Sequence, residues 1–307
     1  MGRYVIRRLL QMVPVFLGTT LLIFLMVNVM GDPIAGLCGE RRCDPATAAR
    51  LRSEFGLDKP VWQQYATYMG NVFTGDFGTA FNGQKVTELM ARAFPVTIRL
   101  TVVAIVFEIV IGISLGVVTG LRRGHPVDTT GLVLTLIVIS VPTFVTGLLL
   151  QLLLGVQWGV IKPSVPPGAP VDALIVPGLV LASVSLAYVT RLTRTSIVEN
   201  ARADYVRTAV AKGLPRRRVV VRHLLRNSLI PVVTFIGTDI GALMGGAIVT
   251  ERIFNIHGVG YQLYQGILRQ NSQTVVGFVT VLVLVFLAAN LLVDLLYAVL
   301  DPRIRYA

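Results

Sequence analysis

Long apolar runs alternate with short polar and basic segments along the whole chain. A helix needs about 20 mostly apolar residues to cross the hydrocarbon core of a bilayer, because lipid offers no partner for an unpaired backbone group. The runs that meet this requirement predict spans at residues 9–30, 99–121, 131–154, 174–192, 229–250 and 274–299. The pattern therefore predicts an all-α integral membrane protein with six transmembrane helices.

The composition agrees with a membrane protein. Hydrophobic residues make up 54% of the 307 residues and charged residues only 14%, which is far from the average of soluble domains. The formal net charge of +12 raises the alternative of a basic, membrane-anchored module that binds nucleic acid through Arg216, Arg217 and Arg218. The basic residues stand between the apolar runs, however, and no nucleic-acid recognition fold is visible. We therefore expect a lipid membrane and no nucleic acid among the partners.

The distribution of lysine and arginine predicts the orientation. The N-terminus, the loop at Arg122 and Arg123, residues 191–226 and the tail at 303–305 are rich in basic residues and alternate with poorer loops. Basic short loops face the cytoplasm, whereas loops as long as residues 31–98 cross regardless of charge. We expect a multi-pass membrane protein with both termini in the cytoplasm.

Four regions follow from this topology. They are an N-terminal transmembrane helix at 1–30, an extracytoplasmic loop domain at 31–98, a core of helices 2–6 at 99–299 with a cytoplasmic coupling loop at 193–228, and a cytoplasmic tail at 300–307. The loop domain has helical periodicity, with Asp44-Pro45 as a helix start. It is too small for a large core of its own, so it packs on the membrane domain or on a docked partner, unless it is a passive linker.

Cys38 and Cys43 are the two cysteines of the chain, and both lie in the predicted external loop. An oxidising compartment favours a disulfide between them. The alternative is metal binding, but two thiolates without a nearby histidine make an incomplete zinc site. We therefore predict a disulfide and no metal site.

The predicted cytoplasmic segment 191–226 contains a helix–turn–helix pattern. Its alanine-rich part favours a helix, which Gly213 and Pro215 end, and a second stretch then leads to Pro231 at the start of the fifth span. Small residues on the first helix can lie closely in the groove of a partner; they are Ala201, Ala209 and Ala211. The segment therefore predicts a coupling helix, although the charges alone also fit a loop that only fixes topology.

This segment resembles the EAA motif of permease subunits in binding-protein-dependent ABC importers. Residues 205–213 and Leu229-Ile230-Pro231 stand where that family has its alanine-rich helix with glycine and its following apolar-proline element, and Glu199 or Asp204 takes the acidic place. The resemblance implies a type I importer permease fold and a contact with the ATPase. The implied coupling residues are Glu199, Asp204, Tyr205, Arg207, Thr208, Ala209, Ala211, Lys212, Gly213 and Leu214.

Further motifs narrow the resemblance to the dipeptide, oligopeptide and nickel permease branch. These motifs are Arg7-Arg8-Leu9-Leu10, Phe55-Gly56-Leu57-Asp58, Gly75-Asp76-Phe77-Gly78, residues 204–209 and Glu251-Arg252-Ile253-Phe254-Asn255-Ile256. The branch implies a pseudo-twofold heterodimer with a sister permease, two cytoplasmic ATPase subunits and an extracytoplasmic binding protein. Short peptides are the implied cargo, with nickel or a haem-like compound as alternatives, and the implied location is the bacterial cytoplasmic membrane.

The sequence has no motif for ATP hydrolysis. No lysine follows glycine and precedes serine or threonine, so a phosphate-binding P-loop is missing, and there is no HExxH pairing. We therefore expect a translocation subunit and not an enzyme. We also expect no cofactor on this chain, and the resemblance implies that ATP and magnesium bind to the partner subunits.

Polar residues inside the predicted spans are candidates for the translocation pathway, because a charge in lipid is costly and usually faces protein or water. They are Asp239, Thr238 and Glu108, and Pro142 is a further candidate because it could bend the third span next to the pathway. Alternatives are an interhelical hydrogen bond for Glu108, a purely structural kink at Pro142, and a secondary transporter that uses Asp239 or Glu108 as an ion site. Residues 254–269 predict a short re-entrant or interfacial helix on the external side.

Overall fold

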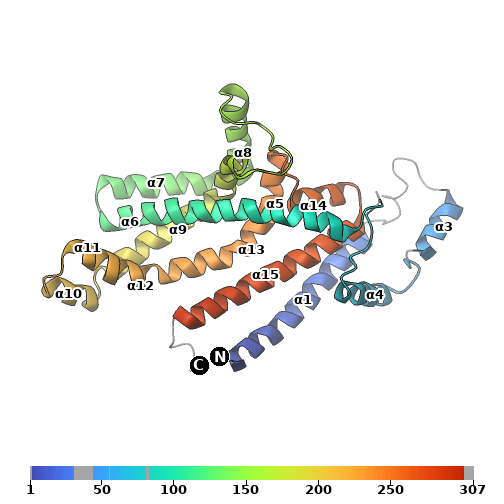
Figure 1. Cartoon of the computed structure of the whole chain (residues 1–307), viewed down its shortest axis with the longest axis horizontal. Helices are drawn as coiled ribbons and strands as arrows, with labels where there is room; N and C mark the ends of the chain where they lie inside the picture. The colour runs from blue at the N-terminus through green and yellow to red at the C-terminus, as the bar shows by residue number, and fades with distance from the viewer. Residues whose placement is uncertain (1, 31–43, 55, 81–82, 301–307) are drawn as a thin grey trace. The chain divides into compact units, whose positions relative to one another are not determined.

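The chain is built almost entirely from helices (Figure 1). The structure is a computed structural model, and it describes residues 2–30, 44–54, 56–80 and 83–300. Within those ranges, extended pairing is limited to a bridge between Thr79 and Lys85. The helices are α1 (Gly2–Met30), α3 (Pro45–Glu54), α4 (Val61–Phe73), α5 (Val86–Phe107), η1 (Glu108–Gly112), α6 (Ile113–Leu121), α7 (Pro126–Ser140), α8 (Thr143–Leu150), η2 (Gln151–Gln157), η3 (Val171–Leu174), α9 (Ile175–Asn200), α10 (Asp204–Ala211), α11 (Arg216–Arg218), η4 (Val219–Leu225), α12 (Arg226–Ser228), α13 (Ile230–Ile253), α14 (Val259–Leu268) and α15 (Ser272–Leu300).

Five helical stretches in the described part of the chain are long and apolar enough to cross a membrane. They are Val5–Val27, Val86–Leu121, Val171–Asn200, Ile230–Ile253 and Ser272–Leu295. Helix α7 passes the same test only together with the α8–η2 segment, so up to six spans are present. The prediction of an all-helical membrane protein is confirmed, and the predicted six spans equal the upper count.

The predicted span at 131–154 is not one straight helix, because the chain bends by 96° between α7 and the α8–η2 segment. The break lies at Val141 and Pro142, which both have extended ψ angles of 124° and 137°. Proline has no N–H to donate and disfavours helical geometry in the residue before it. Pro142 permits a break, and a new helix starts directly after it at Thr143.

Two predicted boundaries also change. The second span starts at Val86 and not at residue 99, so residues 86–98 are the first turns of the long helix α5. Likewise, α9 continues to Asn200, beyond the boundary placed at 193. Both boundaries were drawn where the apolar run stops, but a helix can continue past the lipid with polar side chains on its surface. The helix expected in 254–269 is present as α14.

The helices divide into two compact units, Met1–Ile98 with Asn255–Ala288 and Arg99–Phe254 with Ala289–Ala307. In the first unit, α4 packs on the membrane-type helices α1 and α15. The Tyr65 hydroxyl lies 2.9 Å from Thr20 Oγ1, the Phe24 ring contacts the rings of Tyr65 and Tyr68, and the Tyr68 hydroxyl lies 2.7 Å from Thr280 Oγ1. Burial raises the pKa of Tyr68 to about 12. Helices α3 and α4 confirm the helical periodicity of this segment.

Helix α9 is the centre of the second unit. It contacts η1, α6, α7, α8, α12 and α13, and its buried side chains include Val180, Val189, Thr193 and Ile197. Figure 1 shows α6, α7 and α9 running alongside one another toward α10 and α11. The candidate functional residues gather in this second unit.

Candidate functional site

The predicted helix–turn–helix pattern forms a compact elbow, which we define as residues 201–228 between α9 and α13. Helix α10 ends at Ala211, and Gly213 follows with a left-handed φ of +72°. The Gly213 N–H donates to Val210 O at 2.9 Å and the Leu214 N–H donates to Ala209 O at 3.3 Å. A left-handed glycine after the last turn is a common helix end, because glycine has no Cβ to clash in that conformation. The chain then enters α11, η4 and α12.

One face of α10 packs inward on the rest of the elbow. Val206 and Ala209 form an apolar cluster with Ile197 of α9, and with Val219 and Leu224 of η4. Ala209 is only 4% exposed. The expectation that Ala209 lies in the groove of a partner is therefore wrong. Its small side chain lets α10 approach the chain's own helices.

The rest of the α10 surface is exposed and carries most of the predicted coupling residues. Val210 is 61% exposed and Tyr205 is 37% exposed, which leaves apolar surface on a short charged helix. The Arg207 guanidinium lies 3.8 Å from Asp204 as an exposed ion pair, a kind that contributes little stability. The other exposed residues are Glu199 on α9, Ala201 before α10, and Thr208, Ala211 and Lys212, whereas Leu214 is half-buried beside the apolar cluster.

Hydrogen bonds join α10 to its neighbours. The Tyr205 hydroxyl donates to Asn200 Oδ1 at 2.6 Å, and Asn200 Nδ2 donates to Ser196 O at 2.8 Å. The buried Ser228 hydroxyl, at the end of α12, donates to the same carbonyl at 3.3 Å. These bonds connect α10 through the last turns of α9 to α12, the helix that leads into α13.

Helix α6 lies close against α9 along a row of glycines. A Cβ built on Gly116 would lie 2.5 Å from Thr193 Cβ and 2.6 Å from Thr190 O. A Cβ built on Gly112, at the end of η1, would lie 2.9 Å from the nearest α9 atom, and one built on Gly120 would lie 3.0 Å from its nearest α9 atom. Small residues four apart let helix backbones approach closely. This spacing was visible in the sequence and could have predicted the contact.

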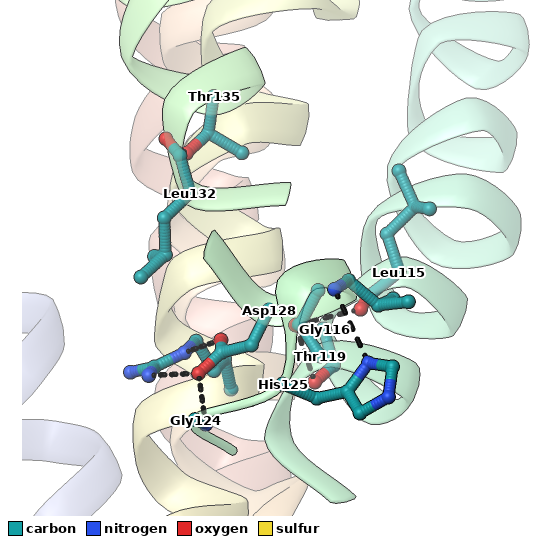
Figure 2. Close-up of polar contacts among 10 residues, drawn as sticks. Leu115, Gly116, Thr119, Gly124, His125, Asp128, Leu132 and Thr135 are labelled. Atoms are coloured by element: carbon teal, nitrogen blue, oxygen red, sulfur yellow. Dashed lines mark hydrogen bonds and ion pairs between the residues drawn. The ribbon is translucent and has the colours of Figure 1, made fainter. Parts of the chain in front are cut away.

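An ion pair that the sequence reasoning missed joins α7 to α9 (Figure 2). Arg194 Nε and Nη2 donate to the two carboxylate oxygens of Asp128, the second at 2.8 Å, and the Gly124 N–H donates to Asp128 Oδ2 at 3.0 Å. The side chains are 5% exposed for Asp128 and 20% exposed for Arg194. A proline before an acidic residue marked the start of α7, but nothing in the sequence indicated the partner.

The candidate pathway residues separate into two groups. Glu108, in the π-turn η1, is fully buried and interacts electrostatically with Asp239 of α13, whose other polar neighbour is Ser185 of α9. The interaction between Glu108 and Asp239 joins η1 to α13, so an interhelical hydrogen bond stays the alternative to a pathway role for Glu108. Thr238 is exposed on α13, and Pro142 is exposed at the break before α8.

The cysteine prediction and the metal prediction stand apart from these sites. Cys38 and Cys43 lie outside the described residues, so their disulfide stays a prediction. In the part of the chain that the structure describes, no group of three or more His, Cys, Asp or Glu side chains could hold a metal ion.

Two family descriptions match the chain. Residues 112–306 match the binding-protein-dependent transport system inner membrane component, and residues 1–101 match the N-terminal part of such a membrane component. The chain belongs to this family. It is therefore a multi-pass inner membrane permease of an ABC transporter, a non-catalytic subunit.

The permease is also similar over its whole length to curated relatives. It is 38% identical to the dipeptide transport system permease protein DppB of Escherichia coli (strain K12), over 100% of this chain and 99% of the relative. It is 37% identical to the di/tripeptide transport system permease protein DppB of Pseudomonas aeruginosa (strain UCBPP-PA14), over 99% and 98%. It is 37% identical to the glutathione transport system permease protein GsiC of Pectobacterium atrosepticum, over 100% of both chains. The resemblance seen in the sequence is confirmed.

Proposed function

We propose that this permease is the translocation subunit of an ATP-driven importer for short peptides. The observation that carries the proposal is the elbow, where Val206 and Ala209 of α10 pack into the chain and the rest of the helix surface is exposed, with Tyr205 and Val210 at the two edges of the packed face. The family and the peptide relatives support the same function. A helix held in this way offers a partner an amphipathic surface whose position is coupled to the membrane helices.

The complex that we propose contains a sister permease in a pseudo-twofold heterodimer, two cytoplasmic ATPase subunits that hold ATP and magnesium, and an extracytoplasmic binding protein. The exposed face of α10 docks in a groove of an ATPase subunit. When that subunit moves, α10 moves Ile197 and Asn200 at the end of α9, because those residues pack on it or bond to it. Ser228 carries the same motion toward α13.

The docking of α10 predicts the effect of a charge on its exposed face. Val210→Glu is expected to abolish ATPase association and ATP-dependent uptake of a labelled dipeptide, because burial of an unpaired carboxylate in a protein interface is costly. The measurement is co-purification of the ATPase subunits, followed by uptake into vesicles that contain the complete importer and ATP. Val160→Glu is the matched control, because Val160 is 70% exposed in the loop that follows η2. It should keep ATPase association.

Two results of this assay would contradict the proposal. ATPase association at the wild-type level in Val210→Glu would show that α10 is not the docking helix. Uptake driven by an ion gradient without ATP would support the secondary transporter, in which Glu108 and Asp239 bind the ion.

Short peptides are the cargo that we propose, and the names of the relatives indicate two kinds of short peptide. Two relatives are named for dipeptide or di/tripeptide transport and one for glutathione transport. Glutathione is itself a short peptide, so the same uptake assay separates the two by competition with an excess of unlabelled glutathione. Competition by nickel or haem, with no competition by peptides, would overturn the peptide assignment.

We also propose that both termini and the elbow face the cytoplasm, with residues 31–98 outside as an extracytoplasmic loop domain. The distribution of basic residues supports this orientation. In a background with Cys38 and Cys43 replaced by serine, a cysteine introduced at the exposed Thr79 is expected to react with an impermeant thiol reagent in intact cells. Labelling only after the membrane is opened would contradict the proposed orientation, because it would place Thr79 in the cytoplasm.

A further inference from the structure

The end of α9 contacts both α10 and α6, which the proposed mechanism does not otherwise connect. On one side, Ile197 packs on Val206 and Ala209 of α10. On the other side, the same residue lies against α6, because a Cβ built on Gly120 would be 3.0 Å from Ile197 Cβ. Motion of α10 therefore reaches the contact between α6 and α9 directly.

The ion pair between Asp128 and Arg194 adds a third contact near the end of α9, in this case with α7. Arg194 stands one turn before Ile197 on α9, and its guanidinium makes a two-point contact with Asp128 in the first turn of α7. Asp128 also accepts the Gly124 N–H in the turn between α6 and α7. A two-point arginine–carboxylate contact fixes orientation as well as distance. The pair therefore fastens the start of α7 and the turn between α6 and α7 to α9.

A largely buried ion pair is weak evidence for a gain in stability, because the desolvation of both charges offsets their attraction. What the geometry supplies is a fixed relation between three helices. We propose that Asp128 and Arg194 are positioning residues that make α6, α7 and α9 move as one body with α10. This inference rests on the proposed function, in which α10 receives the motion of the ATPase. The α6–α7 hairpin then moves together with α9 and α10 when the ATPase subunit moves.

The test compares peptide transported per ATP hydrolysed in vesicles that contain the complete importer. Asp128→Asn and Arg194→Lys both keep the approximate size of the side chain. Asp128→Asn loses the negative charge, and Arg194→Lys keeps the positive charge but loses the planar guanidinium that makes the two-point contact. We expect ATPase association to remain, whereas peptide transported per ATP falls about tenfold, within the usual range of couplings between sites. Asp172→Asn and Arg191→Lys, at exposed positions of η3 and α9, should leave the ratio unchanged.

A covalent replacement of the pair gives the second measurement. Asp128→Cys with Arg194→Cys, in the background that lacks Cys38 and Cys43, should lose coupling and regain it when a short bifunctional thiol reagent joins the two positions. Loss of transport on cross-linking would mean that α7 and α9 separate during the cycle, and would overturn the proposal. An unchanged ratio of transport to ATP in the single variants, even with a lower unfolding temperature, would also overturn it. Failure of the proposed function is distinguishable, because it appears as normal ATPase association in Val210→Glu.

Discussion

The Gly116→Ala variant is expected to lose about 1–3 kcal/mol of unfolding free energy, as overpacked core positions do. The added Cβ would lie 2.5 Å from Thr193 Cβ and 2.6 Å from Thr190 O, whereas carbon atoms in contact lie about 3.5–4.0 Å apart. Thr190 O belongs to the α9 backbone and cannot turn away. Helix α6 must therefore move off α9, which also strains the contact between Asp128 and Arg194. Thermal unfolding of the purified permease in detergent measures the loss.

Gly245→Ala is the matched control for this prediction. Gly245 is also a helical glycine, on α13, but nothing lies within 4 Å of a Cβ built there. Alanine favours a helix over glycine by about 0.8–1.0 kcal/mol, so this variant should be as stable as the wild type or slightly more stable. Equal unfolding temperatures for the two variants would contradict the close contact of α6 with α9. Gly116→Val should be worse than Gly116→Ala, because it adds two more carbon atoms at the same place.

The Gly213→Val variant is expected to insert and fold but to lose most ATP-driven uptake. Gly213 has a φ of +72°, which a β-branched residue adopts only with strain of about 1–3 kcal/mol. Nothing lies within 4 Å of a Cβ built at this position, so backbone strain and not crowding is the cause. The turn shifts to relieve the strain and α10 moves from its place on Ile197. Peptide uptake and ATPase association, measured in the same vesicles, should both fall.

Gly213→Asn separates the backbone conformation from the side chain. Asparagine enters the left-handed region more easily than other residues with a side chain, so this variant should keep most of its uptake. Wild-type transport by Gly213→Val would show that the turn after α10 has no role in coupling, and that the segment only fixes topology. Similar losses in both variants would instead indicate that the open space at Gly213 is filled by a partner subunit.

The features that depend on local pattern were predictable from the sequence. Apolar runs indicated the membrane helices because lipid leaves the backbone no other hydrogen-bond partner. The end of α10 followed from Gly213, whose lack of a Cβ permits the left-handed turn. The family followed from the same segment, because its spacing of acidic, alanine, glycine and proline residues is a property of adjacent positions. Interactions between residues that are close in sequence determine these features.

Other features depended on which helices meet, and only the tertiary structure decided them. A full break at Pro142 and a mild kink both fit one proline, and the structure shows the full break, with a bend of 96°. Ala209 is buried because it packs against η4, and the sequence of α10 alone does not indicate this contact. The pairing of Asp128 with Arg194 joins residues 66 positions apart, and many other basic residues could have been the partner. The sequence by itself determined the membrane helices, the elbow and the family, because these follow from local chemistry. The packing of α6, α7 and α9 into one body depends on close contacts between distant segments, which no local pattern specifies.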